Sequence, residues 1–142
     1  MAEVNILKFV SDNILIVGVA VVSGAMLVWP TLRRGAGGGP AVSTLEATLL
    51  MNQKGALVLD LRDTAEYEKG HVLGSRNVPF GQLEVRAGEF EKYKAKPVVV
   101  VCEAGNRSGR AVGILRKLGF EQVFTLSGGI GGWQQAELPL EK

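Results

Sequence analysis

The segment that most restricts this chain is "NILIVGVAVVSGAMLVWPTL", because its 20 residues between Asp12 and Arg33 carry no charge. A helix that rises about 1.5 Å per residue would extend roughly 30 Å over this length, which is the thickness of the hydrocarbon core of a bilayer. Trp29 suits the membrane interface, and Pro30 helps to end the helix. The pattern therefore predicts a transmembrane helix at residues 13–32.

Two alternatives compete with a membrane span. A cleaved signal peptide fits less well, because Glu3 and Asp12 precede the segment against only Lys8, and no good small-x-small cleavage site comes before the following domain. A buried core helix also fits less well, because the segment is apolar on all faces and is followed by "RRGAGGGP". Arg33 and Arg34 outnumber Lys8 among the flanking basic residues, which places the C-terminal side in the cytoplasm.

The rest of the chain divides around this segment into a tail at 1–12, a glycine-rich flexible linker at 33–42 and a domain at 43–142. With 46% hydrophobic and 21% charged residues, the composition is that of a globular protein. The net charge of +2 comes without a dense basic cluster, so nucleic acid is not an expected partner. One cysteine and one histidine provide neither an internal disulfide nor a structural zinc site, and no metal or cofactor is expected.

Helix and strand patterns alternate along the domain. The capping-box spacing of "STLE" predicts a helix of about eight to ten residues after Ser43. An apolar run predicts a buried strand at 56–61, and the β-branched run from Pro97 through "VVVVC" predicts a central parallel strand. A brief strand is expected near 77–78 and a further one at 122–126. Helices are expected at 64–69, in mixed turns over 80–93, around 111–118 with Gly119 as the cap, and after 127. The alternation predicts a small α/β domain whose central sheet is mostly parallel and flanked by helices.

Cys102 is the last residue of the strongest strand pattern, and a helix is expected to begin about six residues later. Ligands of open parallel sheets bind at the carboxyl ends of strands. The backbone N–H groups from Glu103 to Ser108 can form an anion-binding nest, and the helix N-terminus favours the thiolate, which is the nucleophilic form. Arg107 and Arg110 add positive charge. The alternative is an inert cysteine that closes a buried strand.

Three motifs in the same order resemble those of the rhodanese sulfurtransferase family. "CEAGNRS" resembles the Cys-x-x-Gly-x-Arg-Ser loop of its active site, "DLRDTAEYEKGHVLGSRNVP" its first signature, and "GFEQVFTLSGGIGGW" its C-terminal signature. The resemblance covers roughly residues 43–140 and implies a rhodanese-like fold. A membrane helix ahead of one such domain also resembles small membrane-anchored bacterial rhodaneses, which implies a single-pass protein of the inner (cytoplasmic) membrane.

The resemblance implies that Cys102 takes the outer sulfur of a donor, becomes a persulfide and passes the sulfur to a thiol or cyanide acceptor. The donor would be a small anion such as thiosulfate or a protein persulfide, and no cofactor is implied. The substrate-binding loop would consist of Glu103, Ala104, Gly105, Asn106, Arg107 and Ser108. Asp60 and Arg62 match positions that support this loop, although a solvated pair at the end of a strand is an equal alternative. The acidic Glu103 disfavours a doubly negative donor.

Other activities remain as alternatives. Four residues separate Cys102 from Arg107, whereas the related phosphatases have five, which argues against phosphate as a substrate; arsenate reduction stays open. A second class of function is an adaptor in which the rhodanese fold binds a membrane protein and catalysis is vestigial. His71 is expected to bond to the backbone of its turn rather than to transfer protons. Gly128, Gly129 and Trp133 belong to the C-terminal signature, with Trp133 expected in the core.

Overall fold

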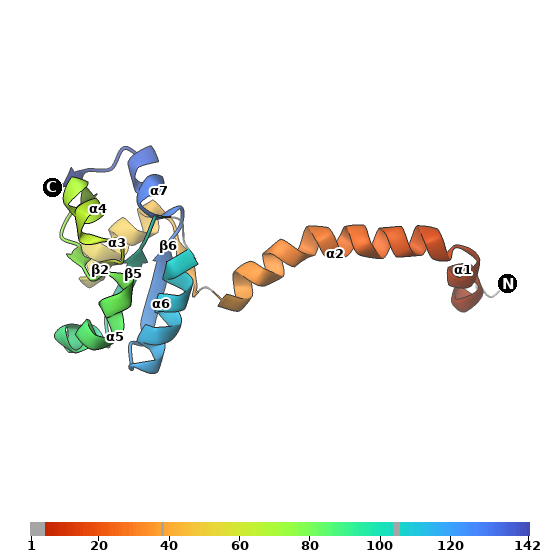
Figure 1. Cartoon of the computed structure of the whole chain (residues 1–142), viewed down its shortest axis with the longest axis horizontal. Helices are drawn as coiled ribbons and strands as arrows, with labels where there is room; N and C mark the ends of the chain where they lie inside the picture. The colour runs from red at the N-terminus through yellow and green to blue at the C-terminus, as the bar shows by residue number, and fades with distance from the viewer. Residues whose placement is uncertain (1–4, 38, 104–105) are drawn as a thin grey trace. The chain divides into compact units, whose positions relative to one another are not determined.

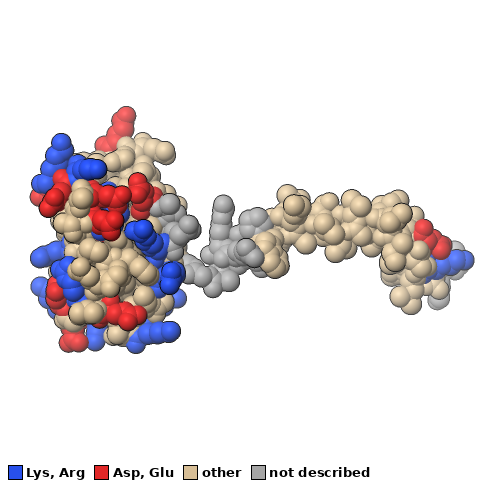
Figure 2. All heavy atoms as spheres, viewed as in Figure 1, with Lys and Arg blue, Asp and Glu red and all other residues tan. Residues whose placement is uncertain are grey.

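The computed structural model describes residues 5–37, 39–103 and 106–142, and the chain forms two compact units, Met1–Ala36 and Gly37–Lys142. The first unit is helical, with α1 at Ile6–Asp12 and α2 at Ile14–Gly37 (Figure 1). The Asn5 side chain caps α1 by accepting a hydrogen bond from the Lys8 backbone N–H. Figure 2 shows that, among the residues of this unit drawn in colour, the charged atoms gather near its N-terminal end. Large apolar side chains are exposed along both helices: Ile6, Leu7, Phe9, Val10, Ile14, Leu15, Ile16, Val19, Val21, Val22, Met26, Leu27, Val28 and Trp29.

The predicted membrane span coincides with most of α2. Among the described residues, no helix taken singly has the length and hydropathy of a membrane span, whereas Ile6–Asp12 and Ile14–Trp29, bent by 93° from one another, have them as a pair. The expectation that Pro30 helps to end the helix is wrong, because α2 continues to Gly37. A proline in a helix removes one backbone donor, and here that loss does not end the helix. The predicted linker at 33–42 therefore overlaps the last turn of α2.

The second unit contains a five-stranded sheet in which every pairing is parallel. Its strand order is β1-β6-β5-β2-β4, with β1 at Ala41–Val42, β6 at Gln122–Leu126, β5 at Pro97–Val101, β2 at Leu57–Asp60 and β4 at Arg76–Asn77. The prediction of a parallel α/β domain with a central "VVVV" strand is confirmed. Strand β1 was not predicted, because two residues between a glycine-rich stretch and a helix cap carry no strand period, and β1 takes its place by pairing with β6.

Helices cover both faces of this sheet (Figure 1). One face packs against the segment formed by η1 (Phe80–Gln82), α5 (Leu83–Arg86) and η2 (Ala87–Tyr93), and against α6 (Asn106–Lys117). The other face packs against α3 (Thr44–Lys54) and α7 (Gly129–Gln135). Alternate residues of β5 supply the two cores, with Val98 and Val100 on one face and Val99 and Val101 on the other, as the two-residue period of a strand requires.

The local signals that predicted the helices are visible in the structure. Helix α3 begins with a complete capping box, in which the Ser43 hydroxyl accepts from the Glu46 N–H and the Glu46 carboxylate accepts from the Ser43 N–H. It ends at Gly55, whose φ of +61° is left-handed. Helix α4 occupies Thr64–Lys69, as predicted. A two-stranded antiparallel sheet of β3 (His71–Val72) and β7 (Leu140–Glu141) was not predicted, since each strand has only two residues.

Candidate active site

The lone cysteine lies directly after β5, at the carboxyl end of the sheet. Cys102 is only 3% exposed, and the Ser108 hydroxyl donates a hydrogen bond to its sulfur at 2.9 Å. Ser108 is itself buried in the first turn of α6. Burial alone would suit an inert core thiol, but the hydroxyl aimed at sulfur stabilises a negative charge there, as does the N-terminus of α6. The arrangement therefore places a hydrogen-bond donor and a helix N-terminus at the cysteine sulfur.

The structure covers part of the predicted substrate-binding loop. Ala104 and Gly105 lie outside the described residues, so the nest of backbone N–H groups stays a prediction. Asn106 is the first residue of α6, and Arg107 follows it with an exposed side chain. The guanidinium of Arg110 lies 5.4 Å from the centre of the Phe80 ring, in a cation–π contact.

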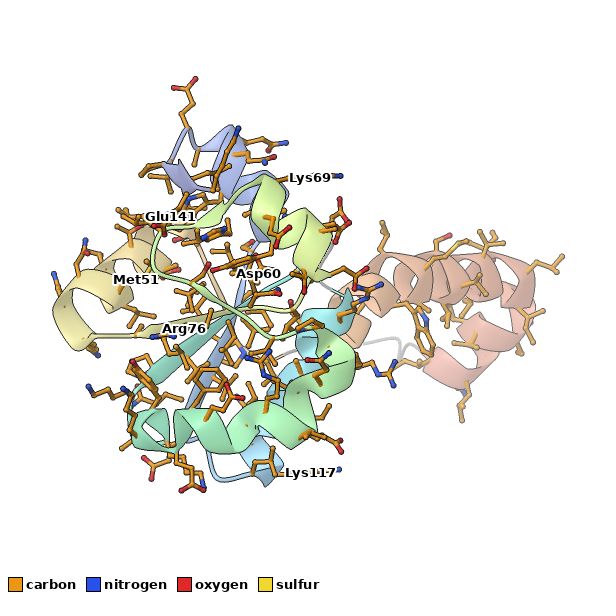
Figure 3. The ribbon with its side chains drawn as sticks, turned by 60° about the vertical axis from the view of Figure 1, so that its left-hand side comes forward. Met51, Asp60, Lys69, Arg76, Lys117 and Glu141 are labelled. Atoms are coloured by element: carbon orange, nitrogen blue, oxygen red, sulfur yellow. The ribbon has the colours of Figure 1, made fainter. Side chains whose placement is uncertain are left out.

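Asp60 and Arg62 form a buried ion pair beside the loop. The side chain of Arg62 donates through Nε to Oδ1 and Oδ2 of Asp60 at 3.0 and 3.1 Å, and through Nη2 to Oδ2 at 2.7 Å. Asp60 is 0% exposed and Arg62 7%, so the alternative of a solvated pair is wrong. Burial opposes the charge of the guanidinium, but the hydrogen bond and charge of Asp60, with the charges of Glu66 and Glu103, raise the pKa of Arg62. Figure 3 shows Asp60 in the interior of the domain.

Strand register brings this pair to the cysteine. Asp60 ends β2 opposite Val101, the residue before Cys102, and the Leu61 N–H donates to the Val101 carbonyl at 2.9 Å. On the other side, Asp60 pairs with Asn77 of β4. The Asn77 side chain donates to the backbone carbonyls of Asp60 and Arg62 at 3.2 and 2.9 Å. Sequence reasoning missed this role of Asn77, whose only signal was its place at the end of a short strand.

Gly129 supports the cysteine loop from the opposite side. Its φ is +59°, and a Cβ on it would overlap the Cys102 carbonyl oxygen and lie 2.9 Å from that of Glu103. The Ile130 N–H donates to the same Cys102 carbonyl at 3.1 Å. The start of α7 and the residues after β5 therefore pack backbone against backbone, which only glycine permits at this position. The "SGGIGG" run signalled a turn, but not a contact with the cysteine.

A cavity of about 240 Å³ opens beside this loop. Glu103, directly after Cys102, lines it together with Ile130 and Gln134 of α7. The other described lining residues are Arg62, Glu66, Lys69 and Gly70. Three of them carry charge, and Figure 3 shows Lys69 extending outward from the end of α4. The cavity is large enough for a small polar molecule, and charged side chains dominate its wall.

His71 and Trp133 have the structural roles that were expected. Nδ1 of His71 bonds to the Tyr67 carbonyl at 2.9 Å, and the two rings stack with their centres 3.7 Å apart. His71 thus bonds to the backbone, as expected, but to a carbonyl of α4 and not to one of its own turn. Trp133 is buried in the core under α7, and its Nε1–H donates to the Pro139 carbonyl at 3.1 Å.

Comparisons with known proteins agree with this geometry. The family model described as "Rhodanese-like domain" matches residues 43–136. YibN, an uncharacterized protein of Escherichia coli K12, is 43% identical over 96 residues, which are 67% of either chain. The thiosulfate sulfurtransferase GlpE of Haemophilus influenzae is 35% identical over 94 residues, covering 64% of this chain and 85% of GlpE.

Among solved structures, a rhodanese-related protein of Thermoplasma volcanium aligns with a TM-score of 0.62 at 31% identity, covering 72% of this chain and 98% of that protein. The family match lies within the unit that holds Cys102. This chain therefore belongs to the rhodanese-like domain family.

Proposed function

We propose that the protein is a membrane-tethered sulfurtransferase that carries sulfane sulfur on Cys102. The observation that carries this proposal is the hydrogen bond from the buried Ser108 hydroxyl to the Cys102 sulfur, at the end of β5 and the start of α6. Such a site holds an anionic sulfur without a separate base. The similarity to GlpE, which is a thiosulfate sulfurtransferase, supports the reaction class.

The proposed reaction has two nucleophilic steps. First, the Cys102 thiolate attacks the outer sulfur of a donor such as thiosulfate; the new S–S bond forms as the donor's own S–S bond breaks, and sulfite leaves with the electron pair. Second, a thiol or cyanide attacks the outer sulfur of the persulfide and regenerates the thiolate. The Ser108 hydroxyl stabilises the anion before and after each step.

In this mechanism the Asp60–Arg62 pair positions the loop without touching the sulfur. Arg62 donates to Asp60 and, through Nη2, to the Gly70 carbonyl at 2.8 Å, so it joins the end of β2 to the end of α4. Because the pair is buried, its geometry is held more tightly than that of a surface ion pair.

The N-terminal unit supports the membrane tether. Its exposed apolar side chains would be stabilised by lipid, and α1 with α2 has the length and hydropathy of a bent span. We propose that this unit holds the domain at the inner (cytoplasmic) membrane, with the domain on the cytoplasmic side, as the flanking Arg33 and Arg34 indicate.

The reaction is tested by incubating the purified protein with thiosulfate and cyanide while thiocyanate is measured and the intact mass is followed for the gain of one sulfur atom. The wild type should form both products, and Cys102→Ser neither. Full activity in Cys102→Ser would overturn the assignment of the cysteine. A protein that forms no persulfide from any donor, yet binds a membrane protein, would instead be the adaptor described above.

The tether is tested by fractionating cells that produce the full chain or a form lacking residues 1–36. The full chain should stay with the membranes after an alkaline carbonate wash, and the shorter form should not. Protease added to spheroplasts should leave the domain intact, and its digestion from outside would overturn the cytoplasmic orientation.

A further inference from the structure

The cavity beside the cysteine loop is lined by charged residues of both signs, only one of which is engaged in an ion pair between described residues. Glu66 and Glu103 are negative, and Arg62 and Lys69 are positive. Arg62 is engaged by Asp60, whereas no salt bridge between described residues engages the two glutamates or Lys69. Two carboxylates and one ammonium are therefore available to a molecule that enters the cavity.

The positions of these groups connect them to the sulfur chemistry. Glu103 follows Cys102 directly, so its Cα lies about 3.8 Å from that of the cysteine. Glu66, in α4, also lines the cavity, and both carboxylates act electrostatically on Arg62. A molecule in this cavity therefore lies against the residue that directly follows Cys102 and against both carboxylates.

The basic residues of α6 do not line this cavity. Arg110 stacks on Phe80, and neither it nor Arg107 is among the described lining residues. Between described residues, the only cation of the wall without an ion pair is Lys69, which extends outward at the rim (Figure 3). A dianion that enters here meets more negative than positive charge, whereas an ammonium group meets two acceptors.

We infer that the cavity selects its sulfur donor by charge, and that it favours an amino-acid persulfide, in zwitterionic form, over thiosulfate. This inference rests on the proposed function of Cys102. The donor's ammonium group lies between Glu66 and Glu103, and its carboxylate faces Lys69 at the rim. Gln134 lines the same wall and offers both a donor and an acceptor.

The corresponding transfer step is balanced without an added oxidant. The Cys102 thiolate attacks the outer sulfur of cysteine persulfide, and the new S–S bond to Cys102 forms as the S–S bond within the donor breaks. The electron pair leaves on the cysteine thiolate, which takes a proton from solvent. The sulfane sulfur is transferred without a net change in oxidation state.

The test measures single-turnover persulfide formation on the full chain in detergent with three donors: cysteine persulfide, N-acetylcysteine persulfide and thiosulfate. N-acetylation removes the ammonium and leaves the persulfide and the carboxylate. The wild type should react about fivefold faster or more with cysteine persulfide than with the acetylated donor, and the preference should narrow with added salt. Because this comparison requires no variant, it does not depend on how a substitution affects folding.

Two variants then locate the effect. Glu66→Gln and Glu103→Gln should each reduce the preference for the free ammonium about two- to threefold and accelerate the reaction with thiosulfate by a similar factor. Glu68→Gln is the matched control, because Glu68 is exposed on the same helix as Glu66 and does not line the cavity. Its donor preference should equal that of the wild type.

The outcomes separate the two proposals. Charge selection is refuted if all donors form the persulfide and the ratio of their rates changes neither with N-acetylation nor in Glu66→Gln and Glu103→Gln. The proposed sulfurtransferase activity would then still stand. No persulfide from any of the three donors would refute the proposed function itself. If Glu68→Gln changed the donor preference as much as the two cavity variants do, the total charge of the domain, and not the cavity, would determine that preference.

Discussion

Replacing Gly129 by alanine should disturb the cysteine loop directly, because this glycine lies against the backbone that follows β5. At a φ of +59°, a residue with a side chain is strained by about 1–2 kcal/mol. The new Cβ would also overlap the Cys102 carbonyl oxygen and lie 2.9 Å from the Glu103 carbonyl oxygen. Forced overpacking of this kind typically costs about 1–3 kcal/mol.

Relief of the overlap requires the two backbones to separate, which weakens the hydrogen bond from the Ile130 N–H to the Cys102 carbonyl by about 1 kcal/mol. Together these costs reach about 3–6 kcal/mol, a large part of the total stability of an ordinary domain. Gly131→Ala is the matched control in the same helix, since a Cβ there meets nothing within 4 Å. It should be neutral or stabilise the domain by up to about 1 kcal/mol.

Urea denaturation followed by tryptophan fluorescence and far-UV circular dichroism measures both variants. Alkylation of Cys102 under native conditions then reports on the loop. Gly129→Ala should unfold at lower urea concentration and change the alkylation rate, and Gly131→Ala should do neither. If Gly129→Ala matches the wild type in both measurements, the contact between α7 and the cysteine loop does not exist as described.

Three further substitutions test other parts of the site and fold. Asp60→Asn leaves the buried Arg62 guanidinium without its carboxylate and should cost about 3–5 kcal/mol in urea denaturation; a loss below 1 kcal/mol would contradict a buried pair. Ser108→Ala removes the donor to the Cys102 sulfur and should slow persulfide formation about ten- to a hundredfold, whereas an unchanged rate would remove Ser108 from the mechanism. Hydrogen bonds from the Ser43 backbone and side chain hold the pKa of Glu46 below its ordinary value of 4.5, so its carboxylate stabilises the fold above that pH and loses this effect as the pH falls through the folded pKa. Wild type and Glu46→Ala should therefore differ in stability at neutral pH and converge in acid.

The sequence predicted those parts of the domain whose signals are local. The capping box at Ser43, the apolar run that ends at Asp60 and the valines before Cys102 each specify an element within a few residues, and each element lies where it was expected. The position of Cys102 at a strand end likewise follows from the pattern. Ser108 was predicted as part of the loop, although its spacing from Cys102 did not show that its hydroxyl meets the sulfur.

The features that escaped prediction depend on contacts between distant segments. Asn77 bridges Asp60 and Arg62 only because β4 pairs with β2, and Gly129 contacts the Cys102 carbonyl only because α7 returns to the carboxyl end of the sheet. Neither residue has a local pattern that distinguishes it from an ordinary turn residue. The burial of the Asp60–Arg62 pair also escaped prediction, because the local sequence of two charged residues at a strand end is the same whether or not distant elements cover them.

The buried Asp60–Arg62 pair also affects how well the site can bind an anion. A guanidinium beside a cysteine would ordinarily suggest a binding site for an anionic sulfur donor, because a planar guanidinium can bind an anion through two hydrogen bonds. Here Nε and Nη2 of Arg62 already bond to Asp60, and Nη2 also bonds to the Gly70 carbonyl. A thiosulfate ion would have to compete with the Asp60 carboxylate, which is completely buried and, within the described part of the chain, forms an ion pair with Arg62 alone. Nε and Nη2 of Arg62 are thus engaged within the fold, and the other charged residues that line the cavity are Glu66, Glu103 and Lys69.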